Sequence, residues 1–91
     1  MEKNRSKIIV LLIKKHGKKA QVMQTIEEMS ELIKELLKDI NRGKENREEI
    51  LEEYCDVVFM LEQLKEIYGI NNEEIEIQMC KKLEKVIKLL E

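Results

Sequence analysis

The chain of 91 residues contains no proline and no tryptophan, and it has only three glycines and two cysteines. Since proline is the residue that most often ends or kinks a helix, its absence permits long uninterrupted helices. Aromatic residues make up only 3% of the chain, while Leu, Ile, Glu and Lys dominate. This composition is typical of helical proteins, including coiled coils. No strand pattern competes with it, so we expect an all-α protein.

The chain also has no long apolar run. Its N-terminal basic residues precede the six apolar residues Ile8–Ile13, and this run is shorter than the apolar core of a signal peptide and is followed by no small-residue cleavage site. A bilayer span needs about 20 apolar residues. We therefore expect a cytoplasmic protein with no membrane partner.

Neither charge sign is in large excess, with 17 basic and 19 acidic residues and a net charge of −2. Such a balance gives no reason to expect a nucleic acid polymer as partner. Cys55 and Cys80 have neither metal-ligand spacing nor the density of a disulfide scaffold. Both lie among apolar residues, and we predict that they are reduced thiols in the core.

Apolar residues recur at helical spacing along most of the chain, which predicts four helices. These should cover residues 3–15, 18–40, 46–68 and 71 to the C-terminus. Gly43 and Gly69 follow the second and third helices, as left-handed terminators do. Asn46 with Glu49, and Asn71 with Glu74, have the capping-box spacing that starts a helix.

A chain this short can build only one modest core, so residues 1–91 should form a single domain. Short connections between long helices favour an antiparallel bundle of about four helices. So few residues leave much apolar surface uncovered, and we expect a homo-oligomer, a dimer or a tetramer, to complete the bundle.

Two acidic motifs are the most informative feature. Glu28 and Glu31 lie three residues apart on the second helix, and Glu53 and Asp56 lie three apart on the third. Residues at this spacing are neighbours on a helix surface, and like charges held together destabilise the helix unless a cation or solvent screens them.

The connection between the two helices predicts where the motifs lie. Counted from a turn centred near Lys44, Glu31 is 13 residues away and Asp56 is 12. At about 1.5 Å rise per residue, the two motifs sit at nearly the same height in an antiparallel pair. Four carboxylates converge if both motifs face the gap between the helices. Oxygen ligands without histidine or thiolate suit Mg²⁺ or Mn²⁺, whereas motifs that face outward would form a solvated acidic surface.

The order of the motifs resembles the MazG-like nucleotide pyrophosphohydrolases, a family of all-α enzymes with EExxE on one helix and ExxD on the next. Here Glu27, Glu28 and Glu31 match the first motif, and Glu53 and Asp56 match the second. The resemblance covers about residues 21–85 and is to the compact, single-domain form of the family.

The resemblance implies Mg²⁺-dependent cleavage of an NTP or dNTP between its α- and β-phosphates, which yields the monophosphate and pyrophosphate. Glu28, Glu31, Glu53 and Asp56 would be the metal ligands, and Glu27 would support them or orient the attacking water. The basic residues of the fourth helix would meet the phosphates, with Lys82 and Lys85 the best matches and Lys81 a weaker candidate. Gln21 and Gln24 are weak candidates for contacts with the base or sugar.

Two alternatives remain open. A non-catalytic helical assembly or regulatory module would explain the apolar stripes and charged faces by bundle packing alone. A dUTPase- or dCTPase-like enzyme on the same fold would carry the same motifs with a narrower substrate.

Overall fold

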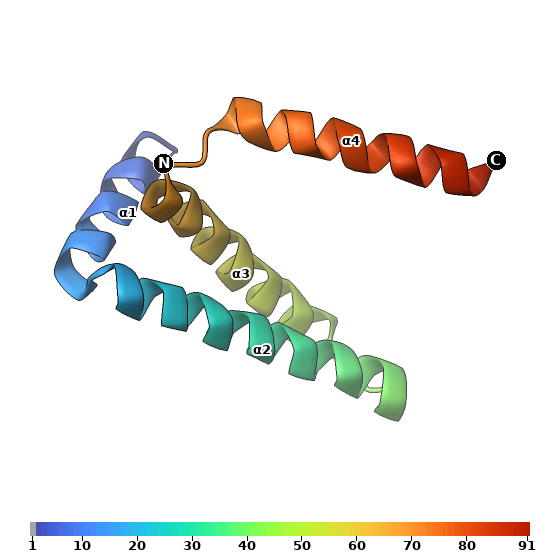
Figure 1. The fold of residues 1–91 in the computed structure, drawn as a ribbon. Coiled ribbons are helices and arrows are strands. Elements are labelled where there is room, and N and C mark those ends of the chain that lie inside the picture. The colour runs from blue at the N-terminus through green and yellow to red at the C-terminus, as the bar shows by residue number, and fades with distance from the viewer. Residues whose placement is uncertain (1) are drawn as a thin grey trace.

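The structure is a computed structural model that describes residues 2–91 (Figure 1). Its helices are α1 (Glu2–His16), α2 (Lys18–Arg42), α3 (Arg47–Tyr68) and α4 (Asn72–Leu90). Over the described range there is no strand, which confirms the prediction of an all-helical chain with four helices. The predicted helix ends lie within two residues of those observed.

Glycines end α2 and α3 as the sequence predicts. Gly43 has φ 59° and Gly69 has φ 64°, the left-handed conformation that an L side chain disfavours. The backbone N–H of Gly43 donates to the carbonyl of Asp39 at 3.1 Å, and that of Ile70 donates to Lys65 at 2.9 Å. These bonds satisfy carbonyls that the helix ends would otherwise leave without partners.

The capping-box prediction is confirmed for α4 and wrong for α3. The side chain of Asn71 accepts from the backbone N–H of Glu74 at 2.8 Å, and the Glu74 carboxylate accepts from the N–H of Asn71 at 3.0 Å. Asn46 makes no side-chain cap bond. Its buried amide instead donates to the backbone carbonyl and the carboxylate of Glu35, both at 2.9 Å. A tertiary contact with α2 has thus displaced the local one.

The antiparallel pair α2–α3 is the centre of the fold, and α1 packs against both helices near the end remote from the α2–α3 turn (Figure 1). The buried apolar residues Ile9, Val57 and Met60 form the core. An ion pair between Arg5 and Glu62, 3.0 Å from Nη1 to Oε2, ties α1 to α3. With so few buried apolar side chains, this core is small for the length of the chain.

The fourth helix stands apart. Lys65 Nζ of α3 donates a hydrogen bond to Asn72 Oδ1 at the first residue of α4. Beyond this bond, α4 does not pack on α1, α2 or α3 over residues 2–91, and it extends away from the end of α3 (Figure 1). One chain by itself therefore packs three helices. Nearly all of α4 is exposed to solvent, with Ile75 as its half-buried exception.

The prediction that both cysteines are core thiols is wrong for the isolated chain. Cys55 and Cys80 are free and exposed. Cys80 is exposed because α4 does not pack on the other described helices, and Cys55 lies on an exposed part of α3. Apolar neighbours in sequence did not predict burial, because the apolar residues of these helices are themselves largely exposed.

None of the four described helices combines the length and the apolar character that a membrane span requires.

Candidate metal centre

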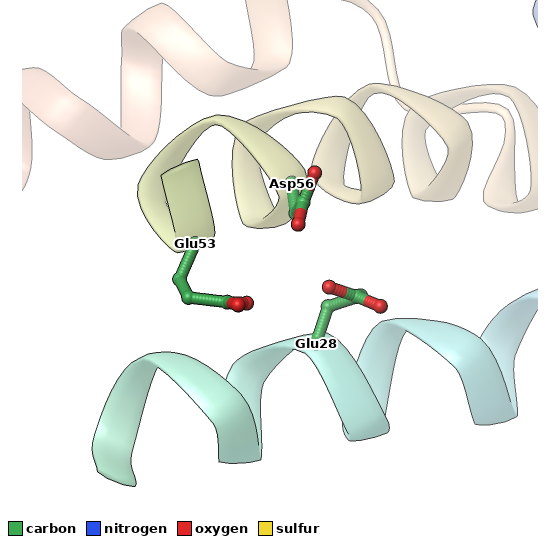
Figure 2. A group of neighbouring side chains, drawn as sticks. All are labelled: Glu28, Glu53 and Asp56. Atoms are coloured by element: carbon green, nitrogen blue, oxygen red, sulfur yellow. The ribbon is translucent and has the colours of Figure 1, made fainter. Parts of the chain in front are cut away.

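Three carboxylates converge between α2 and α3, near the middle of both helices. Glu28 points from α2 toward α3, while Glu53 and Asp56 point back from adjacent turns of α3 (Figure 2). One carboxylate oxygen from each residue lies within 4.8 Å of the others. Three oxygen ligands at this separation are compatible with one hard divalent cation, with water or a phosphate oxygen filling the remaining positions.

Glu53 is the most shielded member of the three. The residue as a whole is half-buried, but its Oε2 atom is buried and has no hydrogen-bond partner among the residues that the structure describes. A buried charged oxygen without a partner is costly, because it has lost water and gained nothing in exchange. A cation between Glu53, Glu28 and Asp56 would satisfy it.

The pKa of Glu53 is raised above the usual value of 4.5. Desolvation is the largest cause, and the negative charges of Asp56, Glu28, Glu31 and Glu52 add to it. Both causes disfavour the ionised carboxylate, and a nearby cation would reverse the effect of the charges. The electrostatics of the cluster are therefore those of a site that lacks positive charge.

Glu31, the fourth predicted ligand, lies outside the group of three. Lys34 Nζ donates to its Oε1 at 3.4 Å on the exposed surface of α2. Glu31 is still near enough for its charge to raise the pKa of Glu53. The structure thus brings together Glu28, Glu53 and Asp56 and leaves Glu31 at the border.

Two polar contacts hold α2 and α3 in register on either side of this cluster. Gln21 Nε2 donates to Gln63 Oε1 at 2.6 Å, and both residues are buried. Gln21 precedes Glu28 by seven residues, and Gln63 follows Asp56 by seven. At about 1.5 Å per residue, this contact lies roughly 10 Å from the carboxylates.

The second contact is the bond between Asn46 and Glu35, on the side of the α2–α3 turn. Glu35 follows Glu28 by seven residues, and Asn46 precedes Glu53 by seven. Asn46 and Lys38 lower the pKa of the Glu35 carboxyl through hydrogen bonds. The two contacts bracket the carboxylates, so a slip of one helix along the other would break both.

The glutamines predicted as base or sugar contacts are already engaged. Gln21 is 8% exposed and bonded to Gln63, so its amide cannot contact a nucleotide without opening the helix pair. The prediction for Gln21 therefore does not agree with its burial. Gln24 is exposed, and its Nε2 donates to Glu28 Oε1 at 2.8 Å. It orients a carboxylate of the cluster. Glu27 is exposed on α2.

The predicted phosphate-binding lysines Lys81, Lys82 and Lys85 are exposed on α4. Because α4 is joined to α3 only at its first residue, Asn72, and does not pack on α2 or α3, the structure does not bring these lysines to the carboxylates of the same chain.

The sequence patterns did not predict the burial of Gln63 and Thr25, and they predicted Asn46 only as a helix cap, whereas all three are buried polar residues. Thr25 Oγ1 donates to the carbonyl of Gln21 at 2.9 Å. The sequence of α2 nevertheless indicates that its contact face is polar. The residues that face α3 recur at 21, 25, 28, 32 and 35, the alternating spacing of three and four that marks one helix face, and four of these five are polar.

Comparisons of the chain with models of protein families, with curated proteins and with solved structures gave no match.

Proposed function

We propose that the chain is a Mg²⁺-dependent nucleoside triphosphate pyrophosphohydrolase of the MazG-like kind, which works as a homo-oligomer in the cytoplasm. The observation that carries the proposal is the convergence of Glu28, Glu53 and Asp56 from two helices, with Oε2 of Glu53 buried and without a partner. Mn²⁺ would suit the same oxygen ligands.

In this proposal each acidic residue of the cluster has a defined role. Glu28, Glu53 and Asp56 would hold the cation, and Glu31 would join them once its surface contact with Lys34 is released. A bound divalent cation supplies Lewis-acid chemistry, since it neutralises phosphate charge and makes water more acidic. Gln24 fixes the orientation of Glu28. Glu27, at the exposed border, would orient the attacking water.

Charge explains why the lysines are needed. A triphosphate carries several negative charges and is repelled by the carboxylates, so phosphates that the cation does not cover require basic partners. Lys82 and Lys85, with Lys81 beside them, are the proposed partners. They would reach the phosphates from a second copy or after α4 moves, because α4 does not pack on α2 or α3 of its own chain.

The test is a panel of NTPs and dNTPs with Mg²⁺ or Mn²⁺, with pyrophosphate and orthophosphate release measured separately. We expect metal-dependent pyrophosphate together with the monophosphate. Turnover confined to dUTP or dCTP would favour the narrower enzyme. Asp56→Asn should abolish turnover and weaken Mn²⁺ binding in a titration, while the matched variant Glu66→Gln, on an exposed part of α3, should change neither. Glu31→Gln tests whether Glu31 is a ligand.

A second candidate function is favoured by one observation, the large exposed apolar surface of α2, α3 and α4. A non-catalytic helical assembly module would use that surface and need no cation. A folded protein that binds no Mg²⁺ or Mn²⁺ and hydrolyses no nucleotide would favour this module. The carboxylates would then be a solvated acidic surface with no ligand.

A further inference from the structure

One ion pair lies at the border of the candidate metal centre. Lys34 Nζ is 3.4 Å from Glu31 Oε1, and the two residues stand three apart on α2. No other basic side chain of residues 2–91 forms an ion pair with a carboxylate of the two acidic motifs. Lys34 is therefore the basic residue that one chain, by itself, already binds to its candidate site.

Helix geometry directs Lys34 toward the carboxylates. In an α-helix each Cα–Cβ bond tilts toward the N-terminus, so a long side chain covers the turn that precedes it. At about 1.5 Å per residue, Lys34 follows Glu31 by roughly 5 Å and Glu28 by roughly 9 Å along the axis. The next lysine on this side, Lys38, leans over Glu35 instead, and its Nζ donates to Oε2 of that residue at 2.9 Å. The two lysines therefore serve different carboxylates.

The pair of Lys34 and Glu31 is exposed, so it can be exchanged easily. The two side chains are 64% and 47% exposed. Water competes for both groups at such a position, and an exposed pair of this kind is weak. A divalent cation has twice the charge of an ammonium group and binds carboxylate oxygens directly. Glu31 would therefore prefer a cation held by Glu28, Glu53 and Asp56 to its contact with Lys34.

A lysine released at this place would answer a need of the proposed substrate. The carboxylates of Glu28, Glu53 and Asp56 repel a triphosphate, and the lysines of α4 do not lie beside them within one chain. Once Glu31 had turned to the cation, the ammonium group of Lys34 would stand about one helical turn from the cluster with no carboxylate to pair with. Phosphate oxygens accept charge-assisted hydrogen bonds from such a group.

We propose that Lys34 exchanges its partner when the site fills. Before a cation binds, Lys34 holds Glu31 away from the other three carboxylates, and after the cation has taken Glu31 the Lys34 ammonium group binds a phosphate of the triphosphate. This inference deepens the proposed function and rests on it. It gives Lys34 two opposite effects, since the residue weakens binding of the cation alone and strengthens binding of the nucleotide together with the cation.

The first effect is measured by titration of the full chain with Mn²⁺ alone, followed by electron paramagnetic resonance at about 0.15 M salt, where distant surface charges are screened. Lys34→Gln should bind Mn²⁺ about threefold more tightly than the parent chain, because it removes the competitor for Glu31 and exposed pairs contribute about this factor. Lys34→Arg keeps the charge and should resemble the parent. The matched control Lys38→Gln, one turn further along α2, should leave the affinity unchanged.

A second background separates the ion pair from general repulsion between Lys34 and the cation. In a Glu31→Gln chain the pair is already broken, so Lys34→Gln should give no further gain in Mn²⁺ affinity. A gain of equal size in both backgrounds would mean that the two residues are not coupled. That result would overturn the exchange of partners.

The second effect is measured with nucleotide analogues. The probes are the α,β-imido analogues of dUTP and ATP, which resist cleavage between the α- and β-phosphates, added to protein in saturating Mn²⁺. Lys34→Gln should bind them about tenfold more weakly than the parent, the loss expected for one charge-assisted hydrogen bond. Equal or tighter binding in Lys34→Gln would overturn the proposal.

These readouts distinguish the inference from the function on which it rests. A parent chain that binds Mn²⁺ and the analogues, with no change in Lys34→Gln, would refute the role of Lys34 and leave the metal centre in place. A parent chain that binds no Mn²⁺ would refute the metal centre and the role of Lys34 together. Circular dichroism should show the same helix content in every variant, because Lys34 is exposed.

Discussion

Replacing Gln63 with leucine would test whether buried polar contacts set the register of α2 against α3. Gln63 is 1% exposed, and its Oε1 accepts from Gln21 Nε2 at 2.6 Å. Leucine keeps most of the side-chain volume but leaves the Gln21 amide buried without an acceptor. An unsatisfied buried donor costs about 1–3 kcal/mol. We therefore expect Gln63→Leu to lower the free energy of unfolding by about 2 kcal/mol.

The double variant decides whether the loss belongs to the pair. Gln21→Leu alone leaves the oxygen of Gln63 without its donor and should cost a similar amount. With both residues changed to leucine, no polar group is left unpaired, and replacing both partners by apolar groups is often nearly neutral. The coupling free energy from the double-mutant cycle should then be about 4 kcal/mol in magnitude, the sum of the two single losses.

Urea unfolding followed by circular dichroism, at one fixed protein concentration, supplies the four free energies. The fixed concentration matters because stability depends on it if the chain is a dimer. A cost below about 0.5 kcal/mol for Gln63→Leu, or a coupling free energy near zero, would refute the reasoning. The register would then depend on the apolar contacts of Val57 and Met60 instead.

Two further predictions concern charge. Glu53→Gln should raise the thermal midpoint in EDTA, because it removes a desolvated charge beside Asp56 and Glu28, and it should abolish any rise on addition of Mg²⁺. An unchanged or lower midpoint in EDTA would contradict the cost of desolvation and repulsion ascribed to Glu53. Asn46→Ala should weaken stability toward acid. The folded-state pKa of Glu35 is lowered from 4.5, so its contribution is present above 4.5 and is lost as pH falls through the lowered value. Removing the hydrogen bond from Asn46 should shrink the difference in the free energy of unfolding between pH 6 and pH 3. The same pH dependence in Asn46→Ala and the parent chain would show that this bond does not lower the pKa of Glu35.

Local signals in the sequence predicted most of the secondary structure. Gly43 and Gly69 end their helices because their conformation is a local property, and the capping box of Asn71 with Glu74 needs only residues three apart. The same spacing gave a wrong prediction at Asn46. Its side-chain amide donates to the carbonyl and the carboxylate of Glu35, 11 residues away, and does not cap α3. Local spacing cannot reveal such a competitor.

The carboxylate cluster was partly predictable because height along a helix follows from counting residues. Counting from the turn placed both acidic motifs at one level, and the structure brings together Glu28, Glu53 and Asp56 at that level. Counting does not fix rotation about the helix axis in the same way. Glu31 lies three residues from Glu28, about 60° around α2, and this rotation turns it toward Lys34 instead of into the group.

The placement of α4 could not be predicted, because its amphipathic pattern specifies an apolar side and no particular partner. The same pattern would suit a fourth helix folded back on α3 or one that packs on another chain. The cysteines failed as core markers for a related reason, since Cys80 is exposed along with the rest of α4.

The distribution of polar and apolar residues over α2 supports the proposed homo-oligomer. The side of α2 that faces α3 carries Gln21, Thr25, Glu28 and Glu35. Apolar residues such as Ile26, Ile33 and Ile40 are exposed on another side of the same helix. A helix pair selected only for the stability of one chain would place the apolar residues between the helices and the polar residues outside, because apolar burial supplies most of the free energy of folding. The inside of the pair instead holds carboxylates that repel one another, with polar contacts seven residues to either side that keep them level. A pair built in this way gains little free energy of folding from its own interior. In the proposed homo-oligomer, burial of the outward apolar residues would supply the stabilisation that the acidic interior lacks.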